Sequence, residues 1–70
     1  MLKISVLNEH ELTVYADVKW IKFDNEMERI YFYFNSSSVE IPYSSADLVL
    51  VDGTVVFENG TISQYRLRGY

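Results

Sequence analysis

The single histidine, His10, lies between Glu9 and Glu11, and no other group of residues comes closer to a metal or acid–base site. Neighbouring side chains on an extended strand point to opposite faces, and metal ligands need further partners to orient them. No known metal-binding spacing surrounds this triplet. The sequence therefore predicts a solvated turn at His10, with no metal and no cofactor.

The other carboxylates and the serines also lack the setting that catalysis requires. A general acid–base pair needs one buried and one solvated carboxyl, whereas the acids here cluster at predicted turns. The serines at 36–38 and 44–45 lack the positioned histidine and glycines of a nucleophile elbow. Two of the three glycines belong to predicted hairpin turns, so no phosphate-binding loop is indicated. We expect a protein that is not an enzyme.

The net charge argues against a protein that binds nucleic acid. The net charge is −4, and affinity for phosphate backbones comes from clustered lysine and arginine. Asp24, Glu26 and Glu28 form an acidic fringe around one predicted turn. This fringe suggests an alternative function, in which the protein mimics a phosphate backbone and blocks a basic groove on a nucleic-acid enzyme, as small phage proteins sometimes do. The simpler interpretation is that these acids keep the domain soluble.

A second alternative is the binding of single-stranded nucleic acid. Such proteins stack bases on aromatic side chains along a basic groove. The aromatic and basic side chains that would serve are Tyr15, Tyr31, Tyr33, Lys19, Lys22 and Arg29. Three cations among so many acidic residues would give such a groove little positive charge, so we expect the partner to be a protein.

The leading hypothesis rests on one predicted outward face in the middle of the chain. It is rich in tyrosine, methionine and arginine, which are enriched at protein–protein interfaces. The predicted interface residues are Tyr15, Ile21, Phe23, Met27, Arg29, Tyr31 and Tyr33. This face predicts a non-catalytic module that contacts another protein, most simply a second copy of itself. Alternatively, the C-terminal hairpin or the tail at 65–70 covers it within one chain.

Length and composition indicate what kind of fold holds these residues. Apolar residues make up 49% of the 70 and aromatic residues 16%, which excludes a disordered chain and fits one domain over residues 1–70. A chain this short buries only about 60% of its unfolded surface, and it has no cysteine for disulfides. Association of identical chains would add burial. No signal-peptide pattern or membrane-length apolar run is present, so we expect a cytosolic protein.

Alternating apolar and polar residues predict strands almost throughout. A long strand over 12–23 is predicted to place its even-numbered apolar residues on the core side: Leu12, Val14, Ala16, Val18 and Trp20. In this register Val6, Ile4 and Leu2 lie opposite Val14, Ala16 and Val18. Across the next two turns Trp20 lies opposite Ile30, and Phe34, Phe32 and Ile30 lie opposite Val39, Ile41 and Tyr43.

The C-terminal half carries the strongest turn signals. Asp52-Gly53 and Asn59-Gly60 predict type I′ hairpins, and residues 43–47 predict a helical or 3₁₀ turn. One hairpin face would hold Leu48, Leu50, Val55, Phe57 and Ile62, and the other Val49, Val51, Thr54, Val56 and Tyr65. We expect an all-β fold, a six-stranded antiparallel meander closing into a small or half-open barrel. The alternative is a two-layer sandwich completed by dimerisation.

Overall fold

The computed structural model describes residues 1–63; Tyr65, predicted on one hairpin face, and the tail at 65–70 lie outside these residues. Over the described residues the chain is all-β, as predicted, and no helix there is long and apolar enough to cross a membrane. The elements are β1 (Leu2–Leu7), β2 (Leu12–Val18), β3 (Trp20–Asp24), β4 (Arg29–Tyr33), β5 (Ser38–Pro42), the 3₁₀ turn η1 (Tyr43–Ser45), β6 (Leu48–Val51), β7 (Thr54–Glu58) and β8 (Thr61–Ile62).

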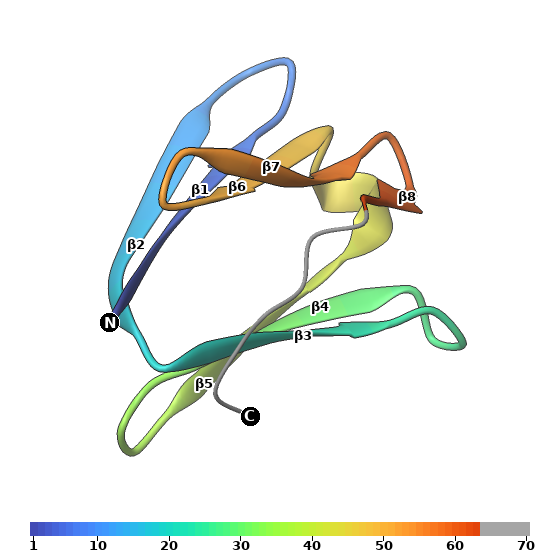
Figure 1. The fold of residues 1–70 in the computed structure, drawn as a ribbon. Helices are drawn as coiled ribbons and strands as arrows, with labels where there is room; N and C mark the ends of the chain where they lie inside the picture. Colours follow the sequence, from blue (N-terminus) through green and yellow to red (C-terminus); the bar gives the residue numbers. More distant parts are fainter. Residues whose placement is uncertain (64–70) are drawn as a thin grey trace.

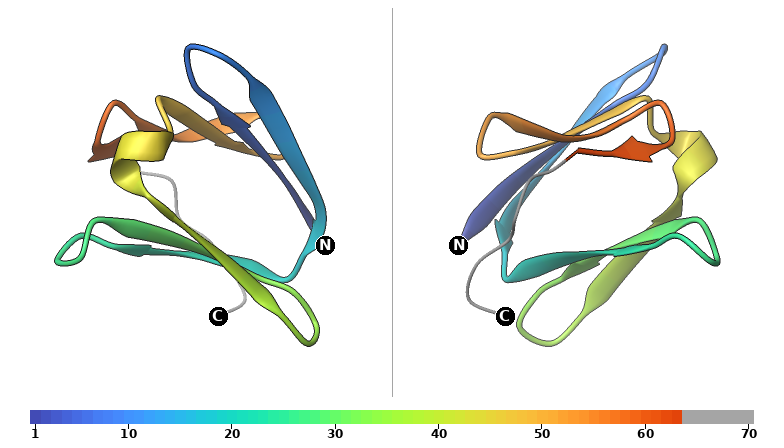
Figure 2. Two further views of the ribbon diagram at one scale, coloured as in Figure 1. Left: turned by 180° about the vertical axis from the view of Figure 1, so that it is seen from behind. Right: turned by 45° about the vertical axis from the view of Figure 1, so that its right-hand side comes forward.

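The strands form two antiparallel sheets. One has five strands in the order β2-β1-β6-β7-β8, and the other has three in the order β3-β4-β5. Figure 1 shows them as two layers, joined at the β2–β3 junction and at η1, and the views in Figure 2 agree. Within residues 1–63 neither sheet closes on itself, so the predicted six-stranded barrel is not confirmed.

The two-sheet arrangement depends on a break in the strand predicted over 12–23. That strand ends at Val18 and resumes at Trp20, so that its two halves belong to different sheets. Just before the break, Asp17 has a φ of 58°, and the β1–β2 register shifts between Leu2 and Ile4. An extra residue on one strand of a pair is a β-bulge, which bends the strand. The bend carries the chain from one layer to the other.

The bulge also exchanges the two faces of β2. Leu2 lies opposite Val18 as predicted, but Ile4 lies opposite Tyr15 and not Ala16. A one-residue shift turns every side chain to the other face. The predicted core side of 12–23 is therefore wrong except at Val18, because Leu12, Val14, Ala16 and Trp20 are all exposed.

The three-stranded sheet has a different register from the one predicted. Trp20 lies opposite Tyr33 and not Ile30, which places Ile21 on the inner side. The β4–β5 pairing is shifted by two residues, with Phe32 opposite Val39. A two-residue shift preserves the faces, so the predicted apolar face of β4 and β5 is confirmed although its cross-strand partners differ.

Both predicted hairpin turns are confirmed. Asp52 and Gly53 have φ of 49° and 87°, and Asn59 and Gly60 have 48° and 86°, as type I′ turns require. The 3₁₀ turn is also found, at Tyr43–Ser45.

The predicted faces of the β6–β7 hairpin are only partly correct. Its register shifts between Val49 and Leu50, which leaves the consecutive residues Val56 and Phe57 both fully buried. Phe57 was predicted to lie on the other face from Val56. The β-bulge turns both side chains inward.

The core lies between the two sheets and is held by aromatic contacts. Ring centroids of Phe23 and Phe57 lie 6.0 Å apart and nearly parallel, and those of Tyr15 and Phe32 lie 5.0 Å apart. Each pair joins the three-stranded sheet to the five-stranded one. A fully buried phenylalanine contributes about 1.5–3 kcal/mol relative to an exposed one, so these rings are principal stabilising contacts.

Candidate interaction surface

The outer surface of the three-stranded sheet is the lower side of the lower layer in Figure 1. Side chains alternate along a strand, so the residues between the buried Ile21, Ile30 and Phe32 point outward. We call this surface the aromatic face; it consists of Trp20, Lys22, Asp24, Arg29, Tyr31, Tyr33, Ser38, Glu40 and Pro42.

Three aromatic rings form a continuous row on this face. Trp20 meets Tyr33 edge to face at 5.5 Å between centroids, and Tyr33 stacks on Tyr31 at 6.1 Å. The Nζ atom of Lys22 lies 5.7 Å from the centroid of the Tyr31 ring, within the range of a cation–π contact. All four residues lie on paired strands, and these contacts link their side chains into one group.

The aromatic face carries balanced charge. Nη1 of Arg29 lies 3.5 Å from Oε2 of Glu40, an ion pair across β4 and β5 in which both side chains are partly exposed. Such pairs contribute little to stability. Asp24 lies opposite Arg29 at the end of β3, so the cations Lys22 and Arg29 are matched by the carboxylates Asp24 and Glu40. The face therefore has no excess of positive charge for a phosphate backbone.

The structure keeps four of the seven predicted interface residues at the surface. Arg29, Tyr31 and Tyr33 lie on the aromatic face, and Met27 is 64% exposed in the adjoining β3–β4 turn. The remaining three residues belong to the core.

Tyr15, Ile21 and Phe23 were predicted to lie on the outward face, and that placement is wrong. Ile21 is fully buried, and Tyr15 and Phe23 pack against the core. The reason is the bulge at Asp17 with the break at Lys19, which reverses the inward and outward positions of the predicted strand.

Sequence reasoning missed Trp20 and Glu40, and it named Lys22 only for the alternative of nucleic-acid binding. A signal for Trp20 and Lys22 was present in the turn chemistry, because aspartate favours the start of a turn. Asp24 Oδ1 accepts hydrogen bonds from the N–H groups of Glu26 and Met27, both at 3.1 Å. Asp24 is therefore the last residue of β3, and this sets Trp20 and Lys22 opposite the two tyrosines.

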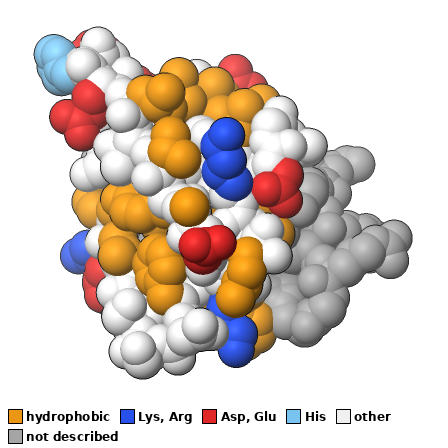
Figure 3. All heavy atoms as spheres, turned by 90° about the vertical axis from the view of Figure 1, so that its left-hand side faces the viewer, with side chains coloured by type: hydrophobic (Ala, Val, Ile, Leu, Met, Phe, Trp, Pro, Cys, Tyr) orange, Lys and Arg blue, Asp and Glu red, His pale blue; other side chains and the backbone are white. Residues whose placement is uncertain are grey.

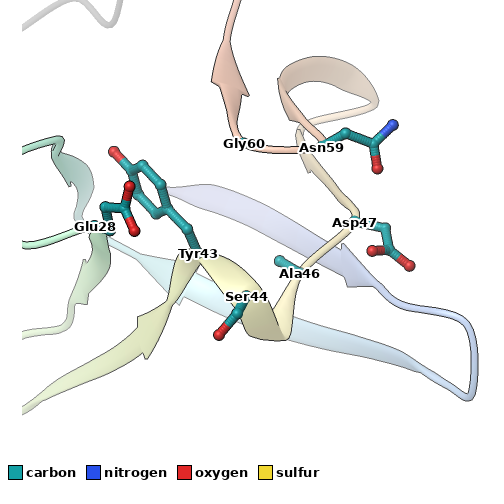
Figure 4. A pocket seen from close by; sticks show the side chains of 7 residues that line it. All are labelled: Glu28, Tyr43, Ser44, Ala46, Asp47, Asn59 and Gly60. Carbon is teal, nitrogen blue, oxygen red and sulfur yellow. The ribbon is translucent and has the colours of Figure 1, made fainter.

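The three carboxylates of the predicted acidic fringe have different surroundings. Asp24 is engaged in the turn, and Glu26 is exposed. Glu28 lines a pocket beside Tyr43 and Asp47, and its carbonyl oxygen accepts the Tyr43 N–H at 2.9 Å (Figure 4).

Tyr43 has a perturbed ionisation. Burial raises the pKa of its hydroxyl above the usual value near 10, and the negative charges of Asp24 and Glu28 raise it further. The hydroxyl donates a 2.7 Å hydrogen bond to Oδ1 of Asn25. These contacts fix the end of the sandwich where β5 meets η1.

His10 lies at the tip of the β1–β2 loop, with its Nε2 3.3 Å from Oε1 of Glu9 and both side chains largely exposed. Within residues 1–63, no group of three or more histidine, cysteine, aspartate or glutamate side chains is placed to hold a metal ion.

The outer surface of the five-stranded sheet is also partly apolar. Leu12, Val14 and Ala16 of β2 are exposed, and Val55 of β7 is 38% exposed. Figure 3 shows hydrophobic side chains spread among charged ones on the side of the molecule where β1 and β2 lie. These residues are aliphatic and form no ring contacts, so they offer a contrast to the aromatic face.

Comparison with protein-family models, with curated proteins and with solved structures found no match for this chain.

Proposed function

We propose that this domain is a non-catalytic interaction module that binds another protein through the aromatic face. The observation that carries the proposal is the continuous row of Trp20, Tyr33 and Tyr31, with Lys22 over the last ring. Tryptophan, tyrosine and arginine are the residues that most often dominate binding energy between proteins.

Two features of the row support this function. Trp20 is 42% exposed, and Tyr31 and Tyr33 are partly exposed, so the rings present apolar surface to the solvent. Their strands restrict the side chains before binding, which lowers the entropy lost when a partner orders them. Exposed aromatic surface of this kind is typical of a contact site.

The charge of the face favours protein over nucleic acid. The face carries two cations, Lys22 and Arg29, and two carboxylates, Asp24 and Glu40, so it offers no net positive charge to a phosphate backbone. The absence of cysteine agrees with a reducing compartment, and we place the domain in the cytosol as part of the proposal.

The test compares two double variants of the full chain. Tyr31→Thr/Tyr33→Thr removes both rings but keeps residues that favour strands, and Leu12→Thr/Val14→Thr is the matched control on the other sheet. Each tagged protein is used to capture partners from the source cell. The captured protein is then purified and titrated. We expect the tyrosine variant to lose at least about tenfold in affinity, and the control to be unchanged.

Three results would contradict this function. One is equal affinity of the wild type and the folded tyrosine variant for every captured protein. Another is tight binding of labelled single-stranded oligonucleotides at low salt, which would indicate the nucleic-acid alternative. The last is salt-sensitive capture that depends on Glu26 and Glu28 and not on the tyrosines, which would indicate the acidic inhibitor.

A further inference from the structure

The two edges of the aromatic face differ in character in two of their three cross-strand rows. In those rows β3 carries the bulky Trp20 and the positive Lys22, while β5 carries the small Ser38 and the negative Glu40. The third row holds Asp24 on β3 and Pro42 on β5, on either side of Arg29. β4 lies between the two edges with its two tyrosines.

The strand register aligns these opposites in rows. Lys22 and Glu40 both lie opposite Tyr31, on either side of β4. In the next row Trp20 and Ser38 both lie opposite Tyr33. Each of these two rows therefore runs from a large or positive side chain, across a tyrosine, to a small or negative one.

We propose that the partner of the aromatic face is a second copy of this chain, related by a two-fold axis that runs parallel to β4. This inference rests on the proposed function and names its partner. Rotation about that axis lays the β5 edge of one copy over the β3 edge of the other, as in sheets packed face to face with nearly aligned strands. Lys22 then meets Glu40 of the second copy, Trp20 meets its Ser38, and the tyrosines pack together at the centre.

The charges favour this axis over a two-fold axis that also lies in the plane of the face but runs across the strands. An axis running across the strands through the central row, that of Tyr31, would place Lys22 on Lys22 and Glu40 on Glu40 of the second copy. Like charges placed in contact oppose association. Among the charged side chains, the axis along β4 brings only Arg29 near its own counterpart, and each Arg29 is already paired with Glu40 of its own chain at 3.5 Å.

The size of the face sets the expected strength of the dimer. Three strands of five residues cover a patch of about 17 Å by 14 Å. That is small beside the roughly 800 Å² per partner of a standard interface. We therefore expect a weak dimer that dissociates on dilution.

Charge reversal tests the arrangement directly. The solution mass of the full chain is measured by light scattering over a concentration series at low salt, for the wild type, Lys22→Glu, Glu40→Lys and the double variant. Each single reversal turns two attractive contacts into two repulsive ones, so we expect the dissociation constant to rise about tenfold. The double variant, and a one-to-one mixture of the single variants, restore opposite charges between positions 22 and 40 and should dimerise more tightly than either single variant. Lys3→Glu, an exposed charge on the other sheet, is the control and should change nothing.

Two results would overturn the inference. A wild type that stays monomeric at every concentration excludes the dimer. If neither the folded double variant nor the mixture dimerises more tightly than the single variants, this axis is excluded. If the purified chain is monomeric but the two tyrosines are still needed to bind a captured protein, this inference fails and the proposed function stands. If the dimer forms equally well with both tyrosines replaced, the aromatic face is not the contact surface and both fail.

Discussion

The hydroxyl of Tyr43 and the side-chain oxygen of Asn25 are joined by a 2.7 Å hydrogen bond that ties the start of η1 to the β3–β4 turn. The backbone N–H of Tyr43 bonds to the carbonyl of Glu28 in the same turn, at 2.9 Å. The Tyr43 ring also packs on Phe57 of the other sheet, with centroids 4.8 Å apart. One residue thus anchors the turn that sets the β3–β4 register, and through it the aromatic face.

Replacing Tyr43 with phenylalanine should lower the free energy of unfolding by about 1 kcal/mol, because the ring remains but Asn25 loses its hydrogen-bond donor. Urea unfolding followed by circular dichroism measures the change. Tyr33→Phe on the aromatic face is the matched control, with an expected change below about 0.5 kcal/mol. Equal effects of the two substitutions would show that the Tyr43 hydrogen bond does not stabilise the fold.

Stability should fall in alkaline solution through the same hydroxyl. The folded-state pKa of Tyr43 is raised by burial and by the charges of Asp24 and Glu28. The folded state therefore holds this proton more tightly than the unfolded state does. The corresponding stability is fully present below the unfolded pKa of about 10, and is lost as pH rises through the folded pKa. In urea titrations the wild type should lose its advantage over Tyr43→Phe as the pH rises above about 10. A constant difference between the two proteins across that range would contradict the assignment.

Alanine at either hairpin glycine should destabilise the fold by about 1–2 kcal/mol, because Gly53 and Gly60 have φ of 87° and 86°. An added Cβ at either glycine meets nothing within 4 Å, so the penalty comes from the backbone alone. Asn59→Gly is the control, since glycine accepts the φ of 48° at that position and should leave stability equal or slightly higher. Thermal unfolding distinguishes these outcomes. Gly53→Ala and Gly60→Ala proteins as stable as the wild type would argue against type I′ turns.

Asp17 offers a test of the bulge between the sheets. Its φ of 58° lies in the left-handed region, which glycine accepts and β-branched residues avoid. We expect Asp17→Gly to keep or slightly raise the stability, and Asp17→Val to lower it by about 1–2 kcal/mol. Chemical denaturation of both variants gives the comparison. If valine and glycine were equally tolerated, the chain would have to make this bend elsewhere.

Phe57→Ala should cost about 3–5 kcal/mol, because Phe57 is fully buried and meets both Phe23 and Tyr43. A loss of that size approaches the whole stability of a small domain, so we expect a largely unfolded protein by near-ultraviolet circular dichroism. Val55→Ala, two residues earlier and partly exposed, is the control and should remain folded. A well-folded Phe57→Ala protein would contradict the central place of this ring in the core.

The hairpin turns could be predicted from the sequence because their chemistry is local. Asp52-Gly53 and Asn59-Gly60 supply residues that accept positive φ, and no distant contact is needed to produce the turn. The alternation in β4 and β5 likewise predicted which side of those strands is apolar, and it brought Arg29, Tyr31 and Tyr33 to the surface.

The arrangement of β2 and β3 was decided only by the tertiary structure. The pattern over 12–23 is apolar on both faces, so an inserted residue at the bulge leaves no trace in the alternation. Packing against β1 buries Tyr15 and exposes Val14, and the break at Lys19 then turns Trp20 and Lys22 outward. Which residues of β2 and β3 form the candidate site thus depends on which of their faces packs against the core. The core exists only when both sheets are in place, because the free energy gained by burying apolar surface requires a second sheet to cover the first.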